Sequence, residues 1–477
     1  MRSASRVHKG TPNREPEGHY GAEGSQRRAV GYVRVSTDMQ ATEGLSLEAQ
    51  QSAIEGYCAL HGIKLVPIQS VEEQVLSDLT SNGVRSDFGR DGLSAQQVLR
   101  LMVLYTMLRT TFEQLEFHLA DSPTYRAFCL LGLTDPPPKH ASIAGNLSKL
   151  RPQTLQALHT HVVRYAVEHK LETVSAVRTD TTSVAAPIRA PLDSALLSDS
   201  VRVLERLLKR AQKWIPTQIP NHRRRASHRT TALRTPKVSK EDRESLYSDL
   251  IEVTKFYVEA ALFAATYLEG INDPKAYFLS IDLRAFAERA LCVVDQTERR
   301  IFDEEVLPPS HKLVSIFEPH TDILCKRNSV VYGHKVCLSF GKTGLVLAAE
   351  VLRGNPADST LTEGAIEQVQ RNSGKTPHDV AMDRGFASKN NVLAVKDLGV
   401  QRVDFGEGRG IDTEKAAGNR RIRRKLRRFR AGAEGLISWL KRSLQMRESR
   451  WKGDQGFDAY VWAVIVTACI QAVARTG

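Results

Sequence analysis

The chain has 477 residues, of which 41% are hydrophobic and 25% are charged. This length and composition exclude disorder throughout and predict two or three domains with a substantial core. The formal net charge of +13 favours a polyanionic partner such as nucleic acid. The six cysteines lie far apart with no C-x-x-C pair, which argues against structural zinc or a disulfide framework and favours a reducing cytoplasm.

The first 28 residues are polar and basic and contain no apolar segment of the kind that a secretory signal requires. We expect a disordered tail there. Residues 29–36 and 63–68 are predicted strands on either side of a predicted helix over residues 47–60. The longest apolar run, residues 459–470, is shorter than the roughly 20 residues that a membrane-spanning helix needs, so we expect no contact with a membrane.

After Ser70 the texture of the sequence changes, which indicates a domain boundary. A polar stretch runs to Gly92, and Ser94 then caps a long predicted helix. Further helices are predicted around residues 111–119 and 153–169, so residues 71–171 read as a helical module. The sequence HASIAGNLSKLRPQTLQALHTHV in this module fits a DNA-binding helix-turn-helix or plain helical packing, and both alternatives stay open.

The following region mixes strands and helices. A strand rich in β-branched residues is predicted to carry Asp180 near its end, and residues 191–328 are predicted to be helical. A hairpin joined by GKTG follows, and strands and helices then alternate as far as VQRVDF, which is an α/β signature. A helix is expected to open at Glu434, and an apolar helix ends the chain, with Trp439, Trp451 and Trp462 assigned to the core.

Three acidic residues stand where a shared site can form. Asp180 lies in a strand, where a buried carboxylate is costly unless it is paired or binds a metal. Asp383 ends the strand VAMD, and a helix carrying Glu434 can pack beside the sheet. Carboxylate oxygens are the ligands that Mg²⁺ and Mn²⁺ prefer. Two such ions roughly 3.5 to 4 Å apart catalyse phosphoryl transfer by activating the attacking oxygen and stabilising the leaving one.

The blocks VRTDTTSVAAPIRAPLDSALLSDSVRVL, KLVSIFEPH, GHKVCLSF, GNPADSTL, VAMDRGF and AGAEGLISWLKR resemble the catalytic blocks of bacterial insertion-sequence transposases of the Asp-Asp-Glu (DDE) type, ISNCY-like or related, over about residues 85–475. The resemblance implies an RNase H-like sheet with a long helical insert after its first strand. It further implies that Asp180, Asp383 and Glu434 are the catalytic, metal-binding triad for two Mg²⁺ or Mn²⁺ ions. Arg384 is implied as a neighbouring support.

A run of basic residues lies immediately before Glu434. Eight like charges repel one another unless anions compensate them, so we predict phosphate contact by this run. A second basic cluster, from His222 to Arg229, fits either DNA contact or a flexible exposed loop. The predicted DNA-binding residues are Arg420, Arg421, Arg423, Arg424, Lys425, Arg427, Arg428, Arg430 and Lys441.

The segment AVGYVRVSTDMQATEGLSLEAQQSAIEGYCALHGIKLV resembles the start of serine recombinases of the resolvase and invertase kind. The resemblance maps the nucleophile of that family to Ser36 and its supporting arginine to Arg34. The rest of the recombinase catalytic domain is missing after Ser70, and a two-strand, one-helix fragment is too small to bury a stable core alone. We therefore interpret residues 29–70 as a vestigial βαβ fragment.

The resulting prediction is an α/β transposase that cleaves and rejoins double-stranded DNA at element ends and target. We expect a homodimer or larger assembly on DNA, in the bacterial cytoplasm and associated with the nucleoid. The alternatives are serine recombination through Ser36 and an inactive DNA-binding fusion remnant. The predicted domains are a tail over 1–28, the recombinase-like fragment over 29–70, the helical module over 71–171, the catalytic domain over 172–445 with its insert over 191–328, and a C-terminal helical segment over 446–477.

Overall fold

The computed structural model divides the chain into two compact units, residues 1–68 together with Gly477, and residues 69–476. In the first unit, β1 (Arg28–Ala29) pairs in parallel with β2 (Lys64–Leu65). The rest of the predicted recombinase-like fragment, with its helix, lies outside the described residues. The structure describes residues 28–29, 64–65, 69–80, 92–132, 134–235, 238–326, 329–407 and 410–476.

The second unit begins with a group of six helices. Ser94 caps α4 as predicted, and it forms a reciprocal capping box with Gln97. The helix α3 was not predicted, because the polar residues around it hide three buried residues at helical spacing, Val71, Val75 and Leu79. The six helices are α3 (Gln69–Thr80), α4 (Ala95–Leu108), α5 (Phe112–Asp121), α6 (Pro123–Phe128), α7 (His140–Leu147) and α8 (Pro152–Glu168).

The packing of α8 bears on the two alternatives for the predicted helix-turn-helix. This helix packs against α17 and α13, and its residues Leu155, Leu158 and Val163 are buried. The ring of His159 is fully buried and bonds through Nε2 to the carbonyl oxygen of Val346 in the sheet over 2.8 Å. A recognition helix has to present a face to the major groove, so this burial favours the packing alternative.

A six-stranded mixed sheet forms the centre of the second unit, with the order β4-β5-β3-β7-β8 and with β6 also paired to β5. β3 pairs antiparallel with β5 and parallel with β7, and β7 pairs parallel with β8. The predicted α/β class is confirmed, and this mixed sheet is consistent with an RNase H-like domain. The strands are β3 (Ala176–Ala185), β4 (Asp322–Lys326), β5 (Ser329–Phe340), β6 (Val346–Leu352), β7 (Asp379–Met382) and β8 (Arg402–Asp404).

Two strands share the edge of β5 that faces away from β3. β6 pairs with residues 335–340 of β5, as the predicted hairpin requires, and β4 pairs with residues 329–333. β3 runs on as far as Ala185, which pairs with Gly333. Asp180 therefore lies in the middle of its strand and not near the end as predicted, because the β-branched sequence that follows it continues the pairing.

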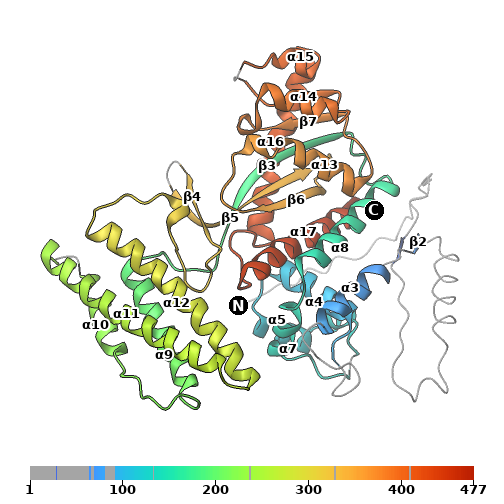
Figure 1. Cartoon of the computed structure of the whole chain (residues 1–477). Helices are drawn as coiled ribbons and strands as arrows, with labels where there is room; N and C mark the ends of the chain where they lie inside the picture. The colour runs from blue at the N-terminus through green and yellow to red at the C-terminus, as the bar shows by residue number, and fades with distance from the viewer. Residues whose placement is uncertain are drawn as a thin grey trace, which may run out of the picture. The chain divides into compact units, whose positions relative to one another are not determined.

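Four long helices connect β3 to β4, and they share one core that includes Leu204, Tyr257 and Leu283. In Figure 1 they lie side by side as a bundle next to the sheet. The predicted helical region extends to residue 328, but the last helix ends at Ile301, and a 3-10 turn and β4 follow it. The helices are α9 (Asp193–Ala211), α10 (Arg223–Leu233), α11 (Lys240–Glu269) and α12 (Pro274–Ile301).

The remaining helices surround the sheet. α16 contacts β3, β7 and β8, whereas α13 contacts β5 and β6. The prediction that a helix opens at Glu434 is wrong, because α16 begins at Arg420 and includes the whole basic run. These helices are α13 (Thr362–Ser373), α14 (Lys389–Asp397), α15 (Thr413–Ala417), α16 (Arg420–Ser443) and α17 (Asp454–Thr476), with 3-10 turns η1 (Pro309–His311), η2 (Asp358–Thr360) and η3 (Arg384–Phe386).

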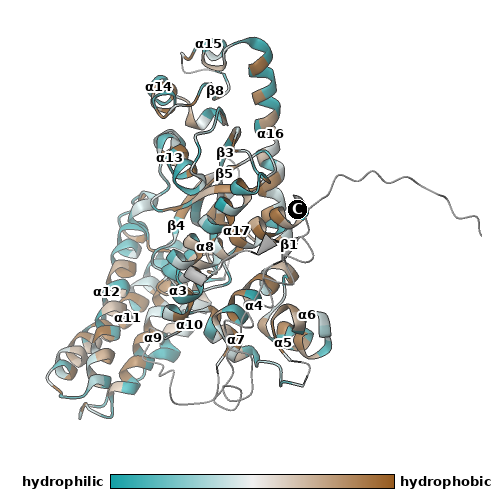
Figure 2. Cartoon of the chain, turned by 90° about the vertical axis from the view of Figure 1, so that its right-hand side faces the viewer, coloured by the Kyte–Doolittle hydropathy of each residue, from teal (hydrophilic) through white to brown (hydrophobic). Residues whose placement is uncertain are grey.

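The last helix, α17, is longer than the apolar run that predicted it. By length and composition alone its residues 454–475 are apolar enough to cross a membrane. The most apolar 18-residue stretch has a mean hydropathy of 1.7, but 67% of that stretch is buried inside the protein. Figure 2 shows this apolar helix beside α8. Trp462 on α17 and Trp451 just before it are buried, as predicted, whereas Trp439 on α16 is half-buried.

A substitution at Gly333 tests the close approach of β5 to the end of β3. A Cβ there would overlap with the carbonyl oxygen of Val184 and would come within 2.7 Å of the Cα of Ala185. Because both neighbours are backbone atoms, we expect Gly333→Ala to lower the free energy of unfolding by roughly 1–3 kcal/mol or more. The measurement is urea unfolding followed by circular dichroism.

The matched control is Gly364→Ala in α13, where an added Cβ meets no atom within 4 Å and alanine favours the helix. We expect this variant to be as stable as the parent or slightly more stable. Equal stability of Gly333→Ala and Gly364→Ala would contradict the close contact between Gly333 and the backbone of β3.

Candidate active site

The centre of β3 presents two charged side chains toward α16. Arg178 and Asp180 lie two residues apart on one face of the strand. Arg178 Nη1 donates to the carbonyl oxygen of Phe429 over 2.9 Å, and its guanidinium lies 4.6 Å from the centre of that ring. This contact fixes the position of α16 along the strand.

Gly432 lets the helix approach the strand closely. A Cβ at this position would overlap with the guanidinium of Arg178, so a side chain there would displace that guanidinium from its contact with Phe429. On the same helix, Ile422, Leu426 and Phe429 pack around Ala381 of β7. The two contacts together bring Glu434, which lies in the middle of α16, beside Asp180.

Asp383 reaches the same place from the end of β7. It directly follows Met382, and the chain then turns sharply through η3. Arg430 Nη1 of α16 donates to Asp383 Oδ1 over 3.1 Å. Because Arg430 lies one helical turn before Glu434, this ion pair fixes the same part of α16 to the end of β7.

The charges of the other two carboxylates act on Asp180. The pKa of Asp180 is raised to about 6, mainly by burial and also by the negative charges of Asp383 and Glu434, against the lowering effects of a hydrogen bond from the Thr181 amide and of the charge of Arg430. The structure therefore brings Asp180, Asp383 and Glu434 within electrostatic reach of one another, although 254 residues separate the first from the last in the chain.

A hollow of about 310 Å³ opens at this point. Basic side chains form part of its wall, which suits an anionic ligand beside the carboxylates. Its lining residues are Asp180, Thr181, Glu434, Ile437, Ser438, Lys441, Arg442 and Arg447.

The three carboxylates are more widely spread than the ligands of a single ion. In the described part of the chain, the group of metal-ligating side chains whose donor atoms all lie within 4.8 Å of one another is a different one, His320, His334 and Asp454. Two ions about 4 Å apart need a ligand set of wider span than one ion does, and the donor chemistry of the triad fits hard divalent cations.

Asp358, in the block GNPADSTL, is a fourth carboxylate near the site and was not among the predicted site residues. It accepts hydrogen bonds from Lys335 Nζ over 3.1 Å and from Thr181 Oγ1 over 3.3 Å. Its side chain also lies against Gly385, just after Asp383. Cys337 of β5 pairs with Thr181, and Lys335 lies two residues before it on the same strand. The strand pairing therefore places Lys335 near Asp358, which the sequence alone does not indicate.

The basic run of α16 divides into paired and unpaired residues. Arg423 and Arg427 form ion pairs with Glu407, and Arg430 pairs with Asp383. The other members of the run are exposed and form no ion pair with any described residue. These exposed cations are Arg420, Arg421, Arg424, Lys425 and Arg428.

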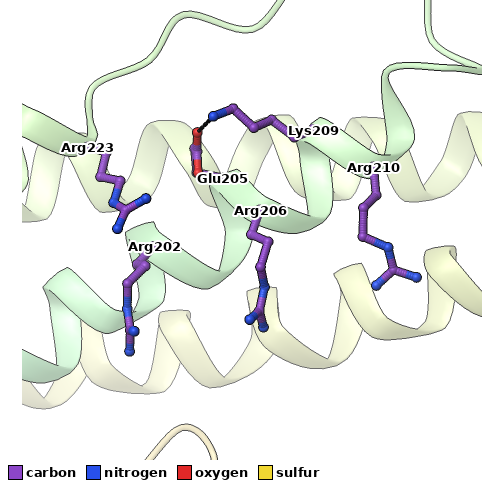
Figure 3. Close-up of a pocket in the computed structure, with 6 residues that line it drawn as sticks. All are labelled: Arg202, Glu205, Arg206, Lys209, Arg210 and Arg223. Atoms are coloured by element: carbon purple, nitrogen blue, oxygen red, sulfur yellow. Dashed lines mark ion pairs between the residues drawn. The ribbon is translucent and has the colours of Figure 1, made fainter.

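The second basic cluster is not a loop, because Arg223–Leu233 is the helix α10. Arg225 and Arg229 are neutralised by Asp249 of α11, and Arg225 also pairs with Glu252. Further basic side chains of the bundle lie around a hollow on α9, where Arg202 also pairs with Asp199 of the same helix (Figure 3). There Arg202, Arg206 and Arg210 extend to the same side of the helix.

Arg384 and Lys441, two other predicted residues, lie near the carboxylates. Arg384 is exposed in η3, next to Asp383, and Lys441 lines the hollow. Ser36 and Arg34 lie outside the described residues. All five described cysteines are free.

The raised pKa of Asp180 predicts a dependence of stability on pH. Because the folded pKa of about 6 exceeds the ordinary value of 3.8, the folded chain binds this proton more readily, so ionisation of Asp180 destabilises the fold as the pH rises from about 4 to 6. We expect Asp180→Asn to raise the unfolding temperature of metal-free protein by a few degrees near pH 7, with the difference shrinking toward pH 4.

Differential scanning fluorimetry across this pH range measures the effect. Asp397→Asn, which changes an exposed carboxylate on α14, is the control and should leave the unfolding temperature unchanged. A difference between Asp180→Asn and the parent that does not vary with pH would contradict the assignment.

Two family models match the chain. One is described as the transposase DDE domain and matches residues 318–470, and the other is described as Transposase domain (DUF772) and matches residues 62–149. No curated protein and no solved structure matches the chain. The first match covers Asp383, Glu434 and the basic run, and the second covers the N-terminal helices as far as α7. The chain is therefore a transposase of the DDE type, an enzyme that transfers nucleotidyl groups on DNA.

Proposed function

We propose that the chain cleaves the ends of an insertion sequence and joins them to target DNA, with Asp180, Asp383 and Glu434 holding two divalent ions, Mg²⁺ or Mn²⁺. The observation that carries the proposal is the convergence of β3, β7 and α16, in which Asp180 and Glu434 line one hollow and Arg430 of α16 pairs with Asp383. When bound, such ions activate the attacking oxygen and stabilise the leaving oxygen of a phosphodiester. The attacking group is water in cleavage and the freed 3′ hydroxyl in joining.

The residues around the triad have separate tasks in this proposal. Asp180 is held on the central strand of an RNase H-like sheet, with the helical bundle as an insert after that strand. Arg430 pairs with Asp383, and it would be close enough to contact a phosphate if Asp383 held a cation instead. Lys441, Arg442 and Arg447 line the hollow and are positioned to bind the DNA backbone beside the scissile bond.

Two surfaces supply phosphate contacts farther from the triad. The exposed residues of α16 lie on the side opposite Leu426 and Ala433, which face the core. The row Arg202, Arg206 and Arg210 on α9 has the four-residue spacing that aligns side chains along one helix face. Contacts of this kind position DNA without reading its sequence. Pairing of two element ends requires at least two protomers, so we propose a dimer or larger assembly in the cytoplasm, at the nucleoid.

Cleavage of labelled element ends in Mg²⁺ or Mn²⁺ tests the triad. We expect Asp180→Asn, Asp383→Asn and Glu434→Gln each to reduce cleavage by a factor on the order of 10³ or more, because each removes a charged ligand of the ions. Glu407→Gln is the matched control, since Glu407 is an exposed carboxylate paired with the same basic helix. It should cleave as the parent does.

Persistent cleavage by Asp383→Asn would overturn the proposal. A denaturant-stable adduct of protein and DNA that disappears in Ser36→Ala would establish serine recombination instead. Absence of cleavage by every version, together with retained DNA binding, would identify the chain as an inactive fusion remnant.

The salt dependence of DNA binding tests the exposed face of α16. Each phosphate contact contributes about 0.9 to the slope of log Kd against log salt concentration. We expect the double variant Arg424→Gln and Arg428→Gln to lower this slope by about 2 and to weaken binding to every DNA sequence alike. Fluorescence anisotropy with a labelled duplex measures both quantities.

The control for this experiment is Arg225→Gln. Arg225 is a cation of α10 that Asp249 and Glu252 already neutralise, so its loss should leave the slope unchanged. An unchanged slope in the double variant of α16 would remove this helix from the DNA-binding surface.

A further inference from the structure

Two histidine rings face each other next to the start of α17. His320 Nδ1 and His334 Nε2 lie 2.7 Å apart. The side chain of His334 is fully buried in β5, and that of His320 is 10% exposed. His334 pairs with Val184, which is four residues along β3 from Asp180, or roughly 13 Å at the rise of an extended strand. The pair is therefore separate from the carboxylate triad.

The outward nitrogen of each ring is held by a carboxylate. His320 Nε2 bonds to Glu318 Oε2 over 2.8 Å, and His334 Nδ1 bonds to Asp322 Oδ2 over 2.9 Å. Glu318 is itself fixed by the amide of Gly453. A carboxylate on the far nitrogen of a histidine is the arrangement that orients imidazole toward a metal ion.

The number of protons in this row of groups is informative. The three bonds from Glu318 through the two rings to Asp322 need three protons, and two neutral imidazoles carry two. A cation held by His320 Nδ1 and His334 Nε2 would leave each ring its other N–H to donate to the adjacent carboxylate, so that no third proton is needed.

The charge around the rings also favours a cation. Asp454 Oδ1 lies 3.5 Å from His320 Nδ1, and Arg353 bridges Asp454 and Asp458. Four carboxylates, Glu318, Asp322, Asp454 and Asp458, surround the pair, whereas Arg353 supplies one positive charge. This excess of negative charge favours a bound cation.

We propose that His320 Nδ1, His334 Nε2 and the Asp454 carboxylate bind one zinc-like divalent ion. Two imidazoles and one carboxylate suit Zn²⁺ or Co²⁺, whereas Mg²⁺ prefers an all-oxygen shell. The donor atoms lie within 4.8 Å of one another, and the ring of Phe457 covers His334 edge-on at 4.8 Å. The ion ties together the segment that follows the bundle, β5 and the start of α17.

Cobalt binding in excess Mg²⁺ tests this site. The full chain is stripped of metal with a chelator, saturated with Mg²⁺ and titrated with Co²⁺. We expect one equivalent of Co²⁺ to bind with the visible absorption of a four-coordinate imidazole site and to be displaced by Zn²⁺. Asp383→Asn should retain this signal, which distinguishes the site from the catalytic carboxylates.

The ligand variants are Asp454→Asn and His320→Gln, and each should weaken Co²⁺ binding by roughly tenfold or more. Asp458→Asn is the matched control, because it removes the other carboxylate partner of Arg353 but no ligand. If His320→Gln fails to fold by circular dichroism, Asp454→Asn decides. Absence of Mg²⁺-resistant Co²⁺ absorption in the parent, or equal affinity in Asp454→Asn, overturns the proposal.

Discussion

The close contact between α16 and β3 is the constraint on which the site depends. Arg178 both donates to the backbone of α16 and lies against Phe429, and the absence of a side chain at Gly432 leaves room for its guanidinium. This packing forces Glu434 toward Asp180 although both are acidic. The fold thus supplies the energy that holds like charges together, and a site built in this way is poised to bind cations.

The presence of the strands near the site could be predicted from the sequence, but the residues at which the helices begin could not. The strands that carry Asp180 and Asp383 were predicted from β-branched and apolar runs, because those residues are buried on the sheet. The start of α16 was missed because eight basic residues obscure its apolar stripe of Ile422, Leu426 and Phe429. The helix α3 was missed for the same reason, since its three buried apolar residues stand among polar ones.

Contacts between distant segments lay beyond the reach of local pattern. No spacing rule links Thr181, Lys335 and Asp358, which meet because β5 pairs with β3 and the block GNPADSTL returns to its end. The histidine cluster illustrates the same limit. Its members come from a connecting segment, a strand and a helix start, so the sequence shows no metal-ligand spacing even though the side chains converge.

The basic side chains of this chain differ in whether an acidic residue lies beside them. The bundle holds many basic residues, yet Arg225, Arg229 and Arg284 are paired with acidic residues of adjacent helices. The exposed residues of α16 lack such partners in the described part of the chain. Among the described residues, the exposed face of α16 is therefore a place where positive charge is left without acidic partners.

The inserted bundle begins and ends beside the same residue of the sheet, Gly333. Ala185 at the end of β3 and Asp322 at the start of β4 both pair with Gly333, from opposite sides. The two ends of the inserted segment are therefore about two strand spacings apart, roughly 10 Å. Connections of very different lengths can span that gap without altering the strand register. The fold therefore allows this segment to be replaced, during evolution or by engineering, while the sheet is kept.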